Sequence, residues 1–157
     1  MLSPMQLNNY FVEELVIRQN SAFDPSPIER NEGRITCNID FGRAVQAEEH
    51  FKLGLTIGVE PALTPPALDP YTISIKIVGF FSFPQTPKLS FEEMSKLVSL
   101  NGASILLGLA RGLVAQSTGV GQFGKYLLPP INLVEVWEKV KTESMVLAQQ
   151  DQNVPQP

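Results

Sequence analysis

The chain has 157 residues, of which 43% are hydrophobic and 18% charged, and its formal net charge is −4. This composition is typical of one globular domain, and a chain of this length buries about 70% of its unfolded surface without a disulfide or a metal. Nucleic-acid affinity depends largely on clustered lysine and arginine, so we expect no nucleic acid as a partner. We expect one domain over residues 1–157, with a disordered tail at about 150–157.

Several features of the sequence indicate a cytoplasmic protein. The single cysteine, Cys37, cannot form an internal disulfide, and residues 1–10 lack the basic and apolar regions of a signal peptide. The most apolar run covers residues 102–115 and is shorter than the roughly 20 residues that span a membrane. We therefore expect this run to be a buried helix, with no direct membrane insertion.

The first half of the chain alternates apolar and polar residues, which predicts half-buried strands over residues 34–41, 51–60 and 71–83. A further strand is expected within residues 7–19, with a bulge or bend at Glu13–Glu14 where the alternation breaks. Loops rich in proline and glycine, rather than helices, separate these strands. Such connections predict an antiparallel sheet.

The second half has helical periodicity. Ser90 and Glu93 have the spacing of a capping box, and an apolar helix is expected over residues 103–116, after an interruption at Asn101–Gly102. Asn132 is expected to cap a final helix. Because the helix over residues 103–116 is apolar nearly all round, one sheet would leave much of it uncovered. A subunit interface is therefore predicted on this helix.

No group of residues in the sequence predicts catalysis or metal binding. Residues 119–124 match a dinucleotide-binding glycine pattern, but they follow a helix rather than a strand, so a loop is the better interpretation. His50 is the only histidine and has no companion ligands. Cys37 lies on the apolar face of its strand, where it is expected to behave as a small hydrophobe. We expect no catalytic residue, no metal and no cofactor.

Aromatic residues are the stronger signal. Phe80, Phe81 and Phe83 cluster at the end of one strand, and alternation places Phe80 opposite the other two, so a regular strand cannot send all three into one core. Phe123 and Tyr126 lie in a later loop. Two interpretations stay open: most of these rings form the core, or some line an apolar groove that binds hydrophobic side chains.

Three segments resemble the SecB family of bacterial export chaperones: residues 101–112, residues 127–133 (Leu-Leu-Pro-Pro-Ile-Asn-Leu) and residues 7–11 (Leu-Asn-Asn-Tyr-Phe). The resemblance implies an α+β fold with a four-stranded antiparallel sheet, a long helix and a shorter C-terminal helix. It also implies a homotetramer, a dimer of dimers, whose grooves hold unfolded chains without ATP. The candidate peptide-binding residues are Phe80, Phe81, Phe83, Phe123, Tyr126, Leu127 and Leu128. The candidate oligomer-interface residues are Leu106, Leu109, Gly112 and Leu113.

The identity of the partner stays open at this stage. SecB proteins present an acidic sheet surface to the export motor SecA, whereas the polar face of the sheet here includes Lys52 and Lys76. Other SecB-like proteins serve as chaperones of an antitoxin. The first expectation is a holdase for protein export, with unfolded preproteins and SecA as partners, and the alternative is a dedicated chaperone of an antitoxin. A carrier of small apolar ligands, an enzyme assembled from distant segments and an interaction module without a groove are the alternatives.

Overall fold

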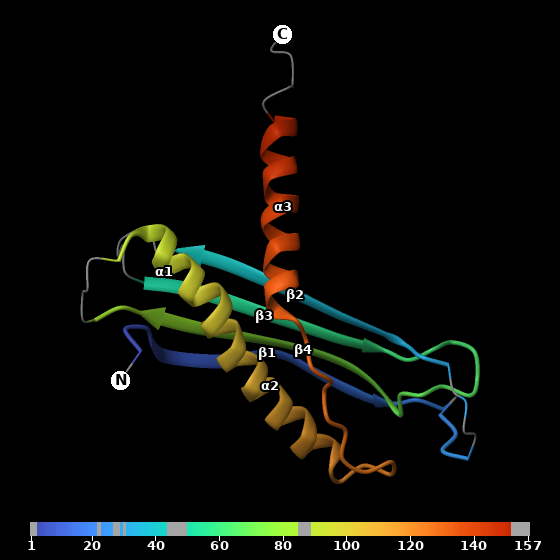
Figure 1. Ribbon diagram of the computed structural model, residues 1–157. Helices are drawn as coiled ribbons and strands as arrows, with labels where there is room; N and C mark the ends of the chain where they lie inside the picture. The colour runs from blue at the N-terminus through green and yellow to red at the C-terminus, as the bar shows by residue number, and fades with distance from the viewer. Residues whose placement is uncertain are drawn as a thin grey trace.

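The computed structural model describes residues 3–21, 23–26, 29, 31–43, 50–84 and 89–151, with side chains described as far as Glu143. Four strands form one sheet: β1 (Gln6–Gln19), β2 (Arg34–Arg43), β3 (His50–Glu60) and β4 (Tyr71–Ser82). Their order across the sheet is β1-β4-β3-β2, and every neighbouring pair is antiparallel. The predicted α+β class and four-stranded antiparallel sheet are confirmed, and β1 and β2 are its two edges (Figure 1).

The first strand is irregular where its alternation breaks. Between Val12 and Glu14 the partner on β4 changes from Ile77 to Lys76, so Glu13 is an extra residue in β1. This is the bulge that the sequence predicted. A second shift follows Leu7, and bulges of this kind increase the local twist of an edge strand.

The helical half differs from the prediction at one point. The elements are α1 (Phe91–Leu97), a π-helical turn (Val98–Gly102), α2 (Ala103–Thr118) and α3 (Leu133–Asp151). The expected interruption at Asn101–Gly102 is wrong, because the π-helical turn joins α1 and α2 into one continuous helix of 28 residues. Figure 1 shows this helix crossing one face of the sheet obliquely.

A glycine at this turn allows close packing rather than ending the helix. A Cβ atom added at Gly102 would lie 3.1 Å from the ring of Phe81 and 3.2 Å from the side chain of Leu53. On the sheet, a Cβ at Gly79 would lie 2.9 Å from the side chain of Leu106. Side chains at these two positions would push the helix and the sheet apart, so glycine is required for their close approach.

The 28-residue helix also corrects the expectation about membrane spans. By length and composition Phe91–Thr118 is apolar enough to cross a membrane, since one 18-residue window has a mean hydropathy of 1.6. The expectation considered only residues 102–115 and missed the continuity with α1. Core helices of other folds meet the same criterion, and 44% of this window is buried inside the subunit.

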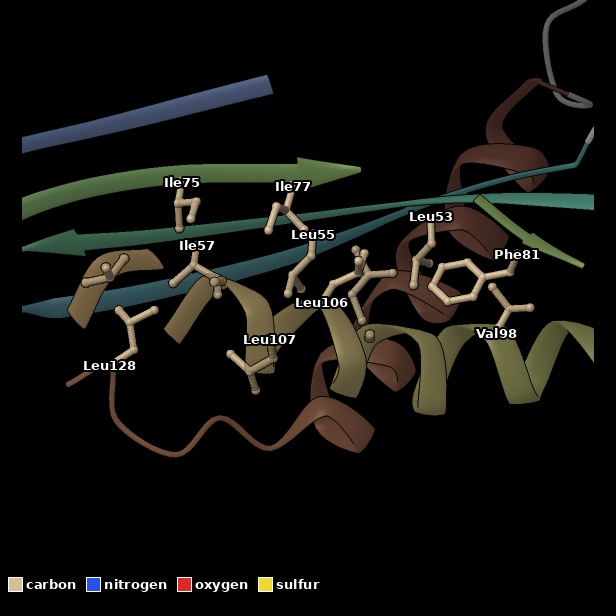
Figure 2. Close-up of a cluster of buried hydrophobic side chains, with 14 of the residues drawn as sticks. Leu53, Leu55, Ile57, Ile75, Ile77, Phe81, Val98, Leu106, Leu107 and Leu128 are labelled. Carbon is tan, nitrogen blue, oxygen red and sulfur yellow. The ribbon is translucent and has the colours of Figure 1, made fainter. Parts of the chain in front are cut away.

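The hydrophobic core lies between the sheet and this helix (Figure 2). Leu53, Leu55 and Ile57 alternate along β3 and face the helix, which contributes Leu106 and Leu107. Burying each such side chain contributes about 1.5–3 kcal/mol relative to leaving it in water. The alternation that predicted β3 therefore also identified its core residues.

Both predicted helix starts are confirmed. Ser90 Oγ accepts a hydrogen bond from the Glu93 N–H at 3.3 Å, and Glu93 Oε2 accepts one from the Ser90 N–H at 2.7 Å. Asn132 Oδ1 accepts a hydrogen bond from the Val134 N–H at 3.2 Å. Each cap satisfies backbone donors that the first turn of a helix leaves unpaired.

Helix α3 has a different position from the other helices. It contacts β2, runs across the strands and projects beyond the sheet (Figure 1). It continues to Asp151, so the first residues of the segment that was expected to be a tail are helical. Residues 152–157 of that segment lie outside the described residues. Helix α3 therefore lies at an angle to the edge strand β2.

Candidate functional site

The segment that connects α2 to α3, residues 119–132, is attached to the end of the sheet. The hydroxyl of Tyr71 donates a hydrogen bond to the carbonyl oxygen of Gly124 at 2.8 Å. Gly124 has a φ of 74°, and a Cβ at Gly121 would lie 2.6 Å from the Tyr71 hydroxyl. The glycines at residues 119–124 therefore allow a left-handed turn and a close approach, and the interpretation of this pattern as a loop is confirmed.

A second tyrosine fixes the same segment. Tyr126 donates its hydroxyl proton to Asp69 Oδ1 at 2.8 Å, and its backbone N–H donates to Thr118 Oγ1 at 2.9 Å. Burial, and then the hydrogen bond to Asp69, raise the pKa of Tyr126 above its ordinary value. The phenol is therefore a neutral donor at physiological pH, and through its hydroxyl and its backbone N–H Tyr126 connects the connecting segment to Asp69 and to the end of α2.

Further along, the connecting segment alternates between the core and the surface. Leu128 is only 4% exposed and belongs to the core cluster shown in Figure 2, whereas its neighbour Leu127 is 69% exposed. Arg111 of α2 donates a hydrogen bond from Nη2 to the carbonyl oxygen of Pro129 at 2.8 Å. These contacts hold the segment in one path that presents Leu127 outward.

A groove of about 720 Å³ lies between the edge strand β2, the end of this segment and α3. Its volume falls within the roughly 300–1,000 Å³ of typical ligand sites. Its apolar lining residues are Ile35, Cys37, Pro129, Pro130, Ile131, Val136 and Val140. Polar and charged residues complete the lining: Arg34, Thr36, Asn38, Thr56, Asn132, Glu135, Lys139 and Glu143. The groove thus combines an apolar surface with a polar rim along an unpaired strand edge.

Two further hollows adjoin this groove through shared residues. One of about 430 Å³ is lined by Arg111 and residues 127–130, and it shares Pro129 and Pro130 with the groove. The other, of about 560 Å³, lies beside the end of β3 and shares Arg34. Each of the two hollows thus borders the groove at the residues that they share.

The structure separates the three phenylalanines that the sequence grouped at the end of β4. Phe81 and Phe83 are almost fully buried in the core, so they are not available to a partner in this structure. Phe80 lies on the opposite face of the sheet, partly exposed, with its ring 6.0 Å from that of Phe11. Strand alternation, which sends Phe81 toward the helix and Phe80 away from it, explains the difference.

The other candidate groove residues have mixed positions. Phe123 and Tyr126 are half-buried and pack around Tyr71, with ring centroids 6.1 and 6.2 Å from it. Leu128 is a core residue, although it also borders a hollow. Leu127 is both exposed and at a hollow. Binding of a peptide by Leu127, Phe123, Tyr126 or Phe80 stays a prediction.

Among the candidate interface residues, Leu106 is fully buried against the sheet of its own subunit (Figure 2). It belongs to the core and is unavailable to a second subunit. Leu109 and Leu113 are half-buried, and Gly112 is exposed, with no described atom within 4 Å of a Cβ built on it. A role for these three in assembly stays a prediction.

The sequence did not identify the apolar residues that line the main groove. Ile35 is 41% exposed although its alternation assigned it to a core face, because β2 is an edge strand that the helices cover only in part. Nearby, Phe41 packs against Trp137 of α3 with ring centroids 6.3 Å apart. Burial raises the pKa of the half-buried Cys37 thiol to about 11, so this thiol stays protonated at neutral pH.

The outer face of the sheet carries charges of both signs. Lys76 Nζ lies 2.7 Å from Glu13 Oε2, and this hydrogen bond lowers the pKa of Glu13 from its ordinary value. Glu13 and Lys76 line a shallow hollow on this face together with Lys52 and Asp40. This face is therefore mixed in charge rather than acidic.

Comparison with known proteins supports the fold. No protein-family model and no curated protein matches the chain. Among solved structures, the Mycobacterium tuberculosis SecB-like chaperone Rv1957, in complex with a ChAD peptide from the Rv1956 HigA1 antitoxin, is 15% identical, with a TM-score of 0.54. The match covers 82% of this chain and 91% of that one. A Streptococcus agalactiae protein of unknown function is 12% identical, with a TM-score of 0.44, over 80% of this chain and 97% of that one. The chain thus has a SecB-like fold.

Proposed function

We propose that this protein is a holdase, a chaperone that binds unfolded polypeptide segments without ATP and catalyses no reaction. The observation that carries the proposal is the groove between β2 and α3, whose half-exposed apolar side chains adjoin two further hollows. Its position along the unpaired edge of β2 suits an extended chain, which can lie beside an edge strand. The SecB-like fold supports the same function, since Rv1957 is a chaperone solved with a peptide.

The energetics of such a groove favour the binding of many different client segments over the binding of one particular sequence. Each apolar client side chain that is fully buried contributes about 1.5–3 kcal/mol. Several such contacts along one chain add through multivalency without requiring a particular sequence. Ile35, Ile131 and Leu127 are spread over this surface and would each receive a different side chain of the same client.

Of the two kinds of client, we favour an antitoxin or a similar dedicated partner over exported preproteins. The Rv1957 complex contains an antitoxin peptide. The outer sheet face here combines Lys52 and Lys76 with Glu13 and Asp40, and it lacks the acidic character expected for docking SecA. With either client, the location that we propose for the protein is the cytoplasm.

Assembly into a homotetramer belongs to the same proposal. Tyr10, Val12 and Leu15 pair with β4 residues that face the helix, yet each is more than a third exposed at the edge of the sheet. On α2, Ile105 is 40% exposed. A second subunit that packs on β1 and α2 would cover these apolar side chains, and a dimer of dimers would cover more of them.

The direct test dilutes an unfolded client from denaturant and follows its aggregation by light scattering, without ATP. We expect suppression at about one tetramer per client. The Ile35→Asp variant, which places a carboxylate in the groove, should lose most of the suppression. Val134→Asp is the matched control, because Val134 is similarly exposed but is not among the residues lining the three hollows.

Two results would contradict the proposal. One is that no client, including antitoxin segments, is protected although the protein is folded and assembled. The other is that both variants retain full activity. A carrier of small apolar ligands would instead bind one such ligand per subunit and would leave client aggregation unchanged.

A further inference from the structure

We propose that the hollow formed by Arg111 and residues 127–130 recognises a carboxylate that lies next to an apolar residue in the bound segment. This inference rests on the proposed function and specifies the chemistry of the client. A groove lined only by apolar side chains would accept hydrophobic segments without regard to charge. Arg111 introduces a preference for acidic residues at one position.

The hydrogen bonding of Arg111 is incomplete. A guanidinium group carries five N–H donors, and it is always charged in proteins. Among the described residues Arg111 has one acceptor, the carbonyl oxygen of Pro129. Its Nε atom is buried and has no hydrogen-bond partner among them. Within the part of the chain that the structure describes, no carboxylate forms an ion pair with Arg111.

The apolar surroundings of Arg111 favour the binding of an anion beside its guanidinium group. The other lining residues of the hollow are Leu127, Leu128, Pro129 and Pro130, and none of them has a charge. An apolar lining lowers the local dielectric, which strengthens a charge-assisted hydrogen bond and makes an unpaired charge costly. A carboxylate would pair with the guanidinium, while the apolar walls would accept the neighbouring side chain.

The hollow is also in the correct position to contact a client in the groove. It shares Pro129 and Pro130 with the groove between β2 and α3, so a single extended segment can contact both. The hydrogen bond to Pro129 holds Arg111 beside this connection. The expected recognition element is therefore an apolar residue followed or preceded by Asp or Glu.

The test compares two capped, fluorescently labelled peptides of Leu, Ser and Thr that differ only in having Leu-Asp or Leu-Asn at their centre. Fluorescence anisotropy with the intact protein should show about 5-fold or more tighter binding of the Leu-Asp peptide at low salt. The preference should decrease as salt screens the charges. Arg111→Gln should abolish the preference, and Lys96→Gln, which removes one exposed positive charge from the same long helix, should keep it.

The outcomes distinguish this inference from the proposed function. Equal binding of both peptides to the unchanged protein overturns the inference and leaves the holdase function intact. Failure of both peptides and of every unfolded client to bind contradicts the holdase function itself. If Arg111→Gln weakens both peptides equally, or changes the oligomeric state while keeping the Asp preference, Arg111 positions residues 127–130 or pairs with a second subunit, and the inference is wrong.

Discussion

Removal of one hydroxyl group should loosen the segment that forms a wall of the groove. In Tyr126→Phe the ring is kept, so packing against Tyr71 is preserved, but the hydrogen bond to Asp69 is lost. Asp69 is only 9% exposed, so its carboxylate cannot recover the lost bond fully from water. We expect a less stable protein and weaker binding of clients.

The size of this effect follows from the kind of bond that is removed. A hydrogen bond to a charged group contributes about 1.5–3 kcal/mol, and a buried acceptor left without a donor keeps much of its desolvation cost. We therefore expect the free energy of unfolding to decrease by about 1.5–3 kcal/mol. Thr142→Val, which removes an exposed hydroxyl from α3, should change it by less than about 0.5 kcal/mol.

The same bond makes a prediction for alkaline pH. The pKa of Tyr126 is raised in the folded state above the ordinary value of 10.0, by burial and by the hydrogen bond to Asp69. Above that pH the unfolded chain loses this proton while the folded chain keeps it, so stability falls as pH rises. Tyr126→Phe lacks this contribution, and the difference in stability between the two proteins should shrink above about pH 10.

Urea unfolding at a fixed protein concentration measures both predictions, because the stability of an oligomer depends on concentration. The midpoint should shift while the slope stays constant, which indicates a change in stability rather than in the extent of unfolding. If Tyr126→Phe unfolds with the same midpoint as the unchanged protein, the hydrogen bond to Asp69 does not stabilise the connecting segment, and the reasoning is refuted.

Other substitutions test the core, the interface and the thiol. Leu106→Ala should reduce the free energy of unfolding by about 2–5 kcal/mol in urea, because its fully buried side chain leaves a cavity. Gly102→Ala should cost about 1–3 kcal/mol by the same measurement, despite the higher helix propensity of alanine, since the new methyl group overpacks against Phe81. Gly112→Leu should leave circular dichroism unchanged but lower the sedimentation coefficient, and an unchanged coefficient would place the interface elsewhere. Cys37 should react with iodoacetamide at neutral pH far more slowly than a free thiol.

Local patterns in the sequence were sufficient to predict most of the strands and helix starts of this fold. The alternation along β3, the break at Glu13–Glu14 and the caps at Ser90 and Asn132 are each set by residues close together in the chain. The continuous helix was missed because Asn101–Gly102 is typical of a helix end. Its glycine instead serves a long-range contact with Phe81, which no local pattern contains.

The candidate site was harder to predict, because it depends on the order of the strands. Alternation assigned Ile35 to a buried face, but the sheet places β2 at its edge, where this side chain is half-exposed. The clustering of Phe81 and Phe83 with Phe80 drew attention to residues that the helix covers completely. Leu127 was identified because the connecting segment resembles that of SecB proteins, which is information beyond periodicity.

The attachment of the connecting segment has a consequence for the order in which the chain acquires its parts. Tyr126 reaches Asp69 across 57 residues and Tyr71 reaches Gly124 across 53, so neither contact forms before the sheet end that carries Asp69 and Tyr71 has been built. Contacts of such sequence separation form late, because the loop must close first. During synthesis the wall of the groove is therefore among the last parts to form. Until residues 127–130 have docked beside Arg111, the hollow that these residues line is not assembled.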